Sequence, residues 1–347
     1  MAIKINNLAI GYNHIPKIIA EIGINHEGSL DTAKKMCELA AEGGADVIKT
    51  QLHLPSEEMS VAAKDLVPGH CTESIFEIME HCALNIDEEF KLKEFIESLD
   101  CTYLSTPFSA KAAHILGAEF RVSAFKIGSG ECNNPSVLDA AASYSKPLIV
   151  STGMNSLSSC KITYEYLEKK HHLKPILMHT TNLYPTPKSL VRLGGIEELQ
   201  KLAGKDHVGL SDHTVDNTAC VGAVALGAVM LERHFTDTKE RQGPDIENSM
   251  DKEELQELRR MVDDMYLMRG GSKYKELEEE QGVRDFAFAT VVSTKNIREG
   301  ELFSMKNTQP KRPGKGDISA REHNQIIGKK ASRSIPPETH IKLEDIS

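Results

Sequence analysis

The chain has 347 residues, of which 40% are hydrophobic and 27% are charged, and its formal net charge is −10. This length accommodates one large domain, or a large domain with a small companion. The acidic balance argues against loose binding to nucleic acid or to an anionic membrane, and no run of 18 apolar residues predicts a transmembrane helix.

The seven cysteines are odd in number and scattered, without a C-x-x-C pair. This pattern predicts reduced thiols in a cytoplasmic protein rather than a disulfide or zinc framework. The N-terminal stretch MAIKINNLAIGYNHIPK has neither a continuous apolar region nor a small-residue cleavage site, so no signal peptide is expected.

Short apolar runs, each ending in polar residues, recur along the first two thirds of the chain. We predict eight buried strands at residues 18–23, 45–51, 102–109, 124–131, 147–154, 175–182, 207–213 and 228–235. Helical periodicity lies between them, as in residues 30–44, 87–100 and 216–228. Eight strand–helix units with strands buried on both faces predict an α/β fold, a (β/α)8 TIM barrel.

A doubly wound open sheet is the main alternative architecture. GSGECN at 128–133 is not the G-x-G-x-x-G dinucleotide fingerprint, however, and no Walker-type phosphate loop is present. The barrel is therefore favoured.

A second module is expected after the barrel. An amphipathic helix follows it, with Asp251 and Glu254 spaced as a capping box. Residues 285–347 contain 11 Lys/Arg and 8 Asp/Glu, a net charge of +3 against −13 for the rest. We predict a barrel over 1–270, a linker over 271–285 and a small domain over 286–347.

The predicted small domain has a faint internal repeat. TKNIREGELFSMKNT and SRSIPPETHIKLEDI share an Ile, a turn with Gly or Pro, another apolar residue and a charged close. Two related β-turn units fit a compact domain of about 60 residues, a size that is marginal for a domain standing alone. We therefore expect it to pack on the barrel or on a partner chain.

Polar side chains collect where the predicted strands end, which is where barrel enzymes place their sites. They are Glu21, Lys49, Gln51, Ser105, Thr106, Lys126, Ser129, Glu131, Ser151, Thr152, Thr180, Asn182, Tyr184, Ser211, Asp212, His213, Glu232 and His234. Lys49 and Lys126 would each be costly to bury alone. A dianion such as phosphate, bound also by neighbouring hydroxyls, would neutralise both lysines; pairing with Glu21 or Glu131 is the alternative.

His213 and His234 follow adjacent predicted strands, which lie about 5 Å apart. Two imidazoles with oxygen ligands or water suit a labile divalent ion such as Mn²⁺ better than a closed zinc site. Without such a pattern, His26, His53, His179 and His207 are expected to form hydrogen bonds within the protein. A metal beside an anion site predicts a phosphorylated substrate that condenses with a carbonyl.

At these residues the sequence resembles the bacterial sialic acid synthases (N-acetylneuraminate synthases). The resemblance covers nearly the whole chain and rests on motifs in the family's order: IIAEIGINHEGS, STPFS, FKIGSGECNN, STGMNS, TTNLYPTP, GLSDHT, LERHFTD, GPDIENSM and KRPGKGD. It implies a TIM barrel followed by an antifreeze-like (SAF) domain. It also implies a phosphoenolpyruvate-dependent, C–C bond-forming transferase that makes N-acetylneuraminate and phosphate from N-acetylmannosamine and water.

The resemblance also implies roles for individual residues. It assigns the metal, usually Mn²⁺ with Mg²⁺ or Co²⁺ as alternatives, to His213 and His234. Phosphoenolpyruvate is placed near Lys49, Thr106, Lys126, Ser129, Ser151 and Ser211. Asn182 and Tyr184 fall near both substrates, and Glu21, Gln51 and Asp245 face the acceptor sugar. Glu21 is the candidate for proton transfer or charge stabilisation.

The family resemblance further implies a domain-swapped homodimer, in which the tail of one subunit covers the partner's barrel. Arg312 then reaches the sugar's N-acetyl group and Phe286 lies near it. Thr50 occupies a position where close relatives often carry His, so the acceptor pocket is expected to differ there.

Four other functions are weighed against this interpretation. A legionaminic or pseudaminic acid synthase would use a diacetamido-trideoxyhexose acceptor. A Schiff-base aldolase would use Lys49 or Lys126, whereas a metal-dependent hydrolase is disfavoured because the first strand lacks an H-x-H pair. A non-enzymatic ice- or carbohydrate-binding protein would leave the polar barrel mouth unexplained.

Overall fold

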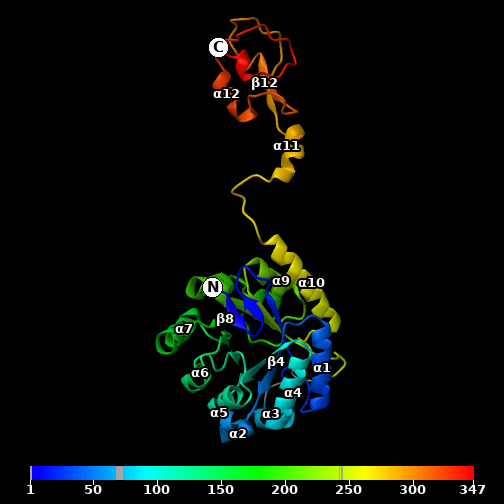
Figure 1. Cartoon of the computed structure of the whole chain (residues 1–347), viewed down its shortest axis with the longest axis vertical. Helices are drawn as coiled ribbons and strands as arrows, with labels where there is room; N and C mark the ends of the chain where they lie inside the picture. Colours follow the sequence, from blue (N-terminus) through cyan, green and yellow to red (C-terminus); the bar gives the residue numbers. More distant parts are fainter. Residues whose placement is uncertain (1, 68–72, 242, 244) are drawn as a thin grey trace. The chain divides into compact units, whose positions relative to one another are not determined.

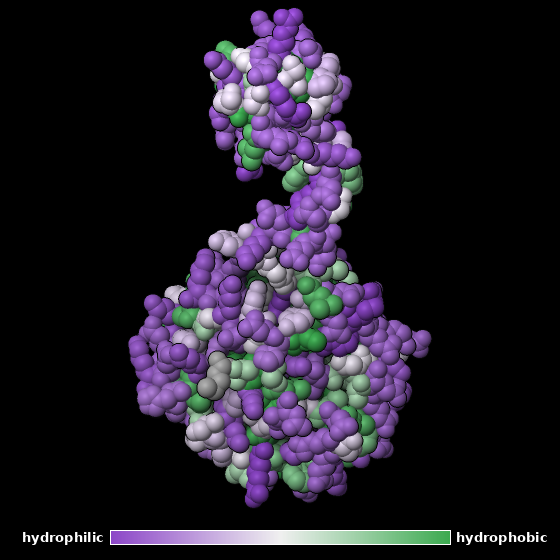
Figure 2. Space-filling model, turned by 45° about the horizontal axis from the view of Figure 1, so that its top comes forward, coloured by the Kyte–Doolittle hydropathy of each residue, from purple (hydrophilic) through white to green (hydrophobic). Residues whose placement is uncertain are grey.

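The computed structural model describes residues 2–67, 73–241, 243 and 245–347. The chain divides into two compact units, Met1–Gly270 and Gly271–Ser347 (Figure 1). On the face drawn in Figure 2, each unit is mainly hydrophilic, with apolar residues in small groups between polar ones. Within the described ranges, no helix is both long enough and apolar enough to cross a membrane.

The first unit is built on one eight-stranded parallel sheet. Its hydrogen-bonded order is β5-β4-β3-β10-β9-β8-β7-β6, so the two end strands, β5 and β6, are consecutive in the chain. The strands are β3 Lys17–Glu21, β4 Val47–Leu52, β5 Thr102–Pro107, β6 Phe125–Ile127, β7 Leu148–Ser151, β8 Ile176–Thr180, β9 Val208–Asp212 and β10 Met230–His234. This nearly closed sheet confirms the predicted (β/α)8 barrel.

Helices surround the sheet (Figure 1). They are α1 Leu30–Glu42, α2 Pro55–Glu58, α3 Ile75–Cys82, α4 Ile86–Ser98, α5 Ala110–His114, α6 Pro135–Ala142, α7 Leu157–His171, α8 Gly194–Ala203, α9 Thr218–Ala225 and α10 Lys252–Met268. Short 3-10 turns lie at Val61–Lys64, Lys188–Leu190 and Lys205–His207, and a π-turn at Ile115–Glu119. The helices expected within 30–44, 87–100 and 216–228 are confirmed, and the Asp251–Glu254 capping box is present at α10.

Strand alternation sorts the side chains into two layers. Ile18, Ala20 and Ile48 point outward into the core beneath the helices, whereas Ile19 and Val47 belong to a separate cluster inside the barrel. Near this inner cluster lies the hairpin of β1 Ile3–Ile5 and β2 Leu8–Ile10, which contributes buried isoleucines to it. The inward positions nearer the carboxyl ends carry polar residues instead, which leaves that end for a site.

The second unit has its own small core. It contains α11 Gln281–Ala287, β11 Thr290–Ser293, β12 Thr308–Lys311 and α12 His323–Ile326, with 3-10 turns at Glu278–Glu280, Ala320–Glu322 and Leu343–Asp345. The two predicted repeat units meet across it: the backbone N–H of Ile297 donates to the Ile335 carbonyl at 2.9 Å, and the reverse bond is 2.8 Å. Residues 271–285, which we expected to be a linker, include the first turns of α11.

Candidate active site

One pocket at the carboxyl ends of the strands gathers the predicted site residues of the barrel. It has a volume of about 240 Å³. Thirteen of the predicted residues line it: Glu21, Lys49, Gln51, Thr106, Lys126, Ser129, Ser151, Asn182, Tyr184, Ser211, His213, His234 and Asp245. Phe286 and Arg312 lie in the second unit, where Phe286 is 62% exposed.

Strand alternation explains which polar residues enter this pocket. On β9, Ser211 points into the barrel while Asp212 points outward, and the next residue, His213, again faces the pocket. On β10, Glu232 and His234 point inward, with Arg233 outward between them. The two adjacent strands thus place their functional side chains next to each other in the pocket.

The residues that point out of the barrel, Asp212 and Arg233, hold these strand ends in place by hydrogen bonds on the outer side of the sheet. Asp212 accepts hydrogen bonds from the N–H and hydroxyl of Thr214, both at 3.0 Å. Its second oxygen lies 3.6 Å from Nε of the fully buried Arg233. Arg233 also donates to Asn217 at 2.6 Å and to the Thr214 carbonyl at 2.8 Å. Asp212, which had no predicted role, therefore fixes the turn that carries His213.

Lys49 is held by an acid and a hydroxyl. Its Nζ lies 2.7 Å from Glu21 Oε2 and donates to Thr106 Oγ1 at 3.1 Å. Both side chains of the ion pair are nearly inaccessible to solvent. The carboxylate partner that we considered as an alternative to a bound anion is thus present for Lys49.

Lys126 has a different environment. Its Nζ donates to Ser151 Oγ at 2.6 Å and lies 3.4 Å from Glu232 Oε1. Glu232 also accepts from Ser211 Oγ at 3.2 Å and lies 3.8 Å from Lys49. Glu232, rather than Glu131, is the acid near Lys126, and it serves both lysines.

Burial and charge shift the acidities in this cluster in opposite directions. Burial raises the pKa of the Glu21 carboxyl to about 7, although Lys49 offsets part of this effect. Burial would also raise the pKa of Glu232, but Lys126 and Lys49 outweigh it and hold that pKa at about 2. Burial lowers the pKa of Lys126. One acid is therefore poised to exchange a proton near neutral pH while the other stays ionised.

The two predicted metal ligands lie side by side at the rim. The rings of His213 and His234 have centroids 5.5 Å apart, and Tyr184 stacks on His213 at 4.2 Å. Burial lowers the pKa of His213 to about 4, and burial with Lys49 lowers that of His234 to about 3. Both imidazoles are therefore neutral at pH 7 and have lone pairs to offer.

These residues fit a divalent metal. His213 Nδ1 donates to the Thr181 carbonyl at 2.8 Å, which leaves Nε2 as an acceptor, the usual arrangement for a ligating histidine. Nδ1 of His234 is buried without a hydrogen bond to any described residue, and Asp245 Oδ2 lies 3.7 Å away. No group of three or more His, Cys, Asp or Glu with metal-binding geometry occurs in the described ranges. The remaining ligands would be solvent or substrate oxygens.

A tight backbone turn after β7 shapes another wall. The N–H of Gly153 donates to Ser129 Oγ at 3.0 Å. A Cβ at Gly153 would lie only 1.6 Å from Asn182 Oδ1, so this close approach requires glycine. Ser129 and Asn182 are thereby held against the same turn.

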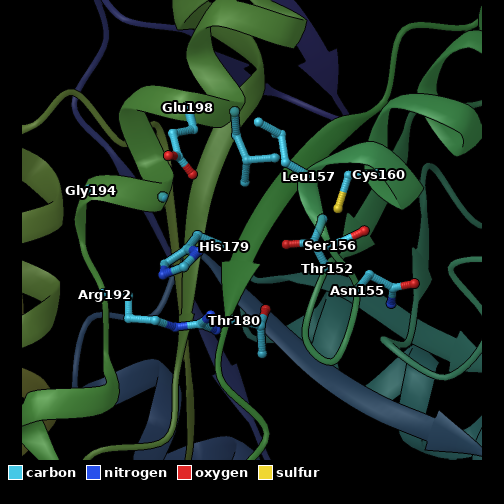
Figure 3. A pocket seen from close by; sticks show the side chains of 12 residues that line it. Thr152, Asn155, Ser156, Leu157, Cys160, His179, Thr180, Arg192, Gly194 and Glu198 are labelled. Atoms are coloured by element: carbon cyan, nitrogen blue, oxygen red, sulfur yellow. The ribbon is translucent and has the colours of Figure 1, made fainter.

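A second cavity, of about 430 Å³, lies on the other side of this wall. Figure 3 shows His179 and Thr180 of β8 between the start of α7 and residues near the start of α8. Thr180 lines both cavities. Thr152 donates to the Met178 carbonyl and His179 to the Val191 carbonyl. Asn155 donates to the Ser129 carbonyl at 3.0 Å, so the wall of this cavity also supports the candidate active site.

Six further residues line the pocket: Phe108, Gly128, Gly130, Glu131, Thr180 and Glu232. Glu131 was considered only as a partner for a lysine, and Glu232 was counted among the polar strand ends without a role of its own. The signal for Glu232 was available, because it stands two residues before His234 on one strand and must share its face. The expectation for Thr50 is wrong for the same reason. Thr50 alternates with Lys49 and Gln51 and points out of the barrel, where its hydroxyl bonds to Glu89.

Comparison with known proteins decides the family. The NeuB family model matches residues 36–274. The chain belongs to the NeuB family. An N,N'-diacetyllegionaminic acid synthase of Campylobacter jejuni is 34% identical, over 94% of this chain and 98% of its own length. The human N-acetylneuraminate-9-phosphate synthase is 31% identical, over 96% of this chain and 94% of its own.

Solved structures agree with this membership. The sialic acid synthetase of Leptospira borgpetersenii, crystallised with citrate, superposes with a TM-score of 0.73 at 28% identity. The match covers 82% of this chain and 95% of that chain. The predicted resemblance to sialic acid synthases is confirmed, since the NeuB relatives include synthases of sialic, legionaminic and pseudaminic acids.

Proposed function

We propose that the protein condenses phosphoenolpyruvate with N-acetylmannosamine and water to give N-acetylneuraminate and phosphate. The observation that carries this proposal is the placement of two buried lysines, five serine and threonine hydroxyls and a histidine pair around one pocket. Lysines and hydroxyls suit a phosphate and a carboxylate, the two anionic groups of phosphoenolpyruvate. Membership of a family of sugar acid synthases supports the same reaction.

The proposed binding mode follows from the charges. Lys126 and Ser151 would take an anionic group of phosphoenolpyruvate, and Lys49 with Thr106 the other. Lys49 and Lys126 already share Glu232 and Lys49 also pairs with Glu21, so phosphoenolpyruvate would add negative charge, which a protonated Glu21 and the proposed divalent ion would offset.

A divalent ion, Mn²⁺ by preference, bound by His213 and His234 would polarise the aldehyde of the open-chain sugar. C3 of phosphoenolpyruvate then attacks that aldehyde, and positive charge develops at C2. Water adds at C2, and the tetrahedral intermediate loses phosphate by C–O cleavage. Glu21, with its pKa near 7, would move a proton or stabilise the developing charge.

The acceptor sugar has a second candidate, a diacetamido-trideoxyhexose. The relatives named N,N'-diacetyllegionaminic acid synthase, at 34% and 30% identity, and pseudaminic acid synthase, at 27–30%, favour it. We keep N-acetylmannosamine as the first proposal, because a sialic acid synthetase is a structural relative over 95% of its chain.

We also propose that the active form is a domain-swapped homodimer. Arg312 and Phe286 of one subunit would then complete the acceptor site of its partner, as the family resemblance implies. Deletion of residues 285–347 should abolish synthesis if this is right. An intact rate from the isolated barrel would instead favour a separate binding role for the tail.

One assay tests the reaction. Phosphate release from phosphoenolpyruvate is measured with N-acetylmannosamine and with its diacetamido analogue, each with Mn²⁺ and with EDTA. We expect phosphate release with one of the two sugars, and we expect that release to require the metal. Borohydride should not trap a keto substrate on the protein. Absence of release with both sugars would overturn the proposal, and borohydride trapping would point to a lysine Schiff base instead.

A further inference from the structure

A buried histidine outside the pocket contacts one of its walls. His53 follows β4, and only 6% of its surface is exposed. Its Nε2 lies 2.8 Å from Gln51 Oε1, and its Nδ1 lies 2.8 Å from Glu58 Oε1 of α2. The ring stacks on the pocket residue Phe108, with centroids 4.2 Å apart and an interplanar angle of 13°.

The hydrogen bonds of Gln51 fix the direction of this contact. Its amide Nε2 donates to Glu21 Oε1 at 2.7 Å. A carboxylate oxygen accepts, so the amide nitrogen must face Glu21 and the amide oxygen must face His53. His53 Nε2 therefore carries the proton that it donates to Gln51.

Glu58 gives the other ring nitrogen of His53 an acceptor as well. Its Oε1 faces His53 Nδ1, while its Oε2 accepts from the backbone N–H of Leu54 at 3.3 Å. With an acceptor oxygen at each ring nitrogen, both bonds are made when Nδ1–H donates to Glu58 and Nε2–H donates to Gln51. A ring with its only proton on Nδ1 would present a lone pair to the amide oxygen, which is unfavourable in a buried site.

We propose that His53 and Glu58 are positioning residues, which lock the Gln51 amide and, through it, the Glu21 carboxylate against the acceptor sugar. The relay runs Glu58–His53–Gln51–Glu21 in bonds of 2.7–2.8 Å. The relay does not contact Lys126 or Ser151, which bind each other, and it meets the proposed phosphoenolpyruvate site only through the Glu21–Lys49 pair. The relay therefore governs sugar use more than phosphoenolpyruvate affinity.

This inference rests on the proposed function for its kinetic readout. Breaking a buried hydrogen bond to a charged or coupled group costs roughly 10- to 100-fold in binding or rate. We expect His53→Leu to lower kcat/KM for the sugar by about this factor, while KM for phosphoenolpyruvate changes less than about twofold. His53→Gln keeps a donor near Nε2 and should recover most of the loss.

The control is His207→Leu. His207 is partly buried, and its ring, like that of His53, makes a hydrogen bond within the protein: it donates to the Pro175 carbonyl at 3.2 Å. It precedes β9 and therefore lies at the opposite end of the barrel from the pocket. The two leucine variants should lose similar melting temperature, but only His53→Leu should change sugar kinetics.

A double-mutant cycle makes the test sharper. If His53 acts through Gln51, the variant His53→Leu/Gln51→Ala should be no worse than Gln51→Ala alone. Additive losses, an equal rise in KM for phosphoenolpyruvate, or wild-type kinetics in His53→Leu would each overturn the positioning role.

A readout that needs no turnover separates this proposal from the reaction itself. A crystal structure of full-length His53→Leu should show the Gln51 side chain rotated away from Glu21, while His53→Gln should retain the contact. If the wild type proves inactive but His53→Leu shows this rotation, only the proposed reaction is overturned. An unmoved Gln51 would sink the positioning role whether or not the wild type turns over.

Discussion

Lys49 Nζ lies 2.7 Å from Glu21 Oε2, across neighbouring strands at the mouth of the barrel. The pair is buried and shared with Gln51 and Glu232, so neither group is a free charge. A lysine held in this way presents its positive charge at a fixed point, and an acid held in this way can lose or gain a proton within the substrate pocket.

Glu21→Gln should lower kcat by about 10²- to 10⁴-fold, the range typical of general acid–base groups. Burial raises the pKa of Glu21 to about 7. If the ionised form works, wild-type kcat rises with pH through that value and the variant loses this limb. A pH profile with metal and both substrates at saturation measures it. Near-normal turnover in Glu21→Gln would show the assignment to be wrong.

Lys126→Met should weaken phosphoenolpyruvate binding far more than sugar binding. The variant removes the ammonium that lies near Glu232 and Ser151. It also leaves Glu232 less compensated, at a cost of about 3–5 kcal/mol of stability. Calorimetric titration with phosphoenolpyruvate, alongside the melting temperature, checks both effects. Lys126→Arg serves as the control, and unchanged affinity in Lys126→Met would refute the anion site.

His213→Ala and His234→Ala should each lower the affinity for Mn²⁺ by more than tenfold, because each would supply one of two protein nitrogens. His179→Ala is the matched control, since His179 donates to the Val191 carbonyl behind the pocket. Titration with Mn²⁺ followed by electron paramagnetic resonance reads binding without turnover. Equal Mn²⁺ binding in all three variants and the wild type would exclude the histidine pair as the site.

Glu89→Gln should make stability less dependent on pH. Burial raises the pKa of Glu89 to about 7, although bonds from Thr50 and Tyr103 lower it in part. The folded state thus holds this proton more tightly than the unfolded state, and wild-type stability falls as pH rises from about 4.5 to 7. The loss is on the order of 3 kcal/mol. Urea unfolding at pH 5 and pH 8 should show a smaller difference for the variant, and an equal difference would contradict the prediction.

Arg233→Met should destabilise the barrel by about 3–5 kcal/mol, because it leaves Asp212 buried without its cation. The surface pair Lys188–Asp216, at 2.5 Å, offers the contrast: Lys188→Met should cost no more than about 1 kcal/mol. Denaturant unfolding of both variants measures the two values. Similar losses would mean that Asp212 and Arg233 do not support the turn that carries His213.

Much of the fold could be predicted because its signals are local. Apolar runs of six to eight residues and helical repeats depend on neighbours in the chain, and all eight strands were located by them. Thr50 shows a local rule that was available but not applied, since period-two alternation already sets it opposite Lys49. The first turns of α11, by contrast, fall in a segment with few apolar residues, where the pattern carries little information.

The sequence by itself determined the barrel and the chemical types of residue at its mouth, because strand periodicity and polar strand ends are patterns of neighbouring residues in the chain. Only the tertiary structure decided which acid serves which lysine. Glu21, Lys49 and Glu232 come from the first, second and eighth barrel strands, and they meet because β10 pairs with β3 to bring His234 beside Glu21. A contact across more than 200 residues depends on that closure and on side-chain packing, which no local pattern encodes.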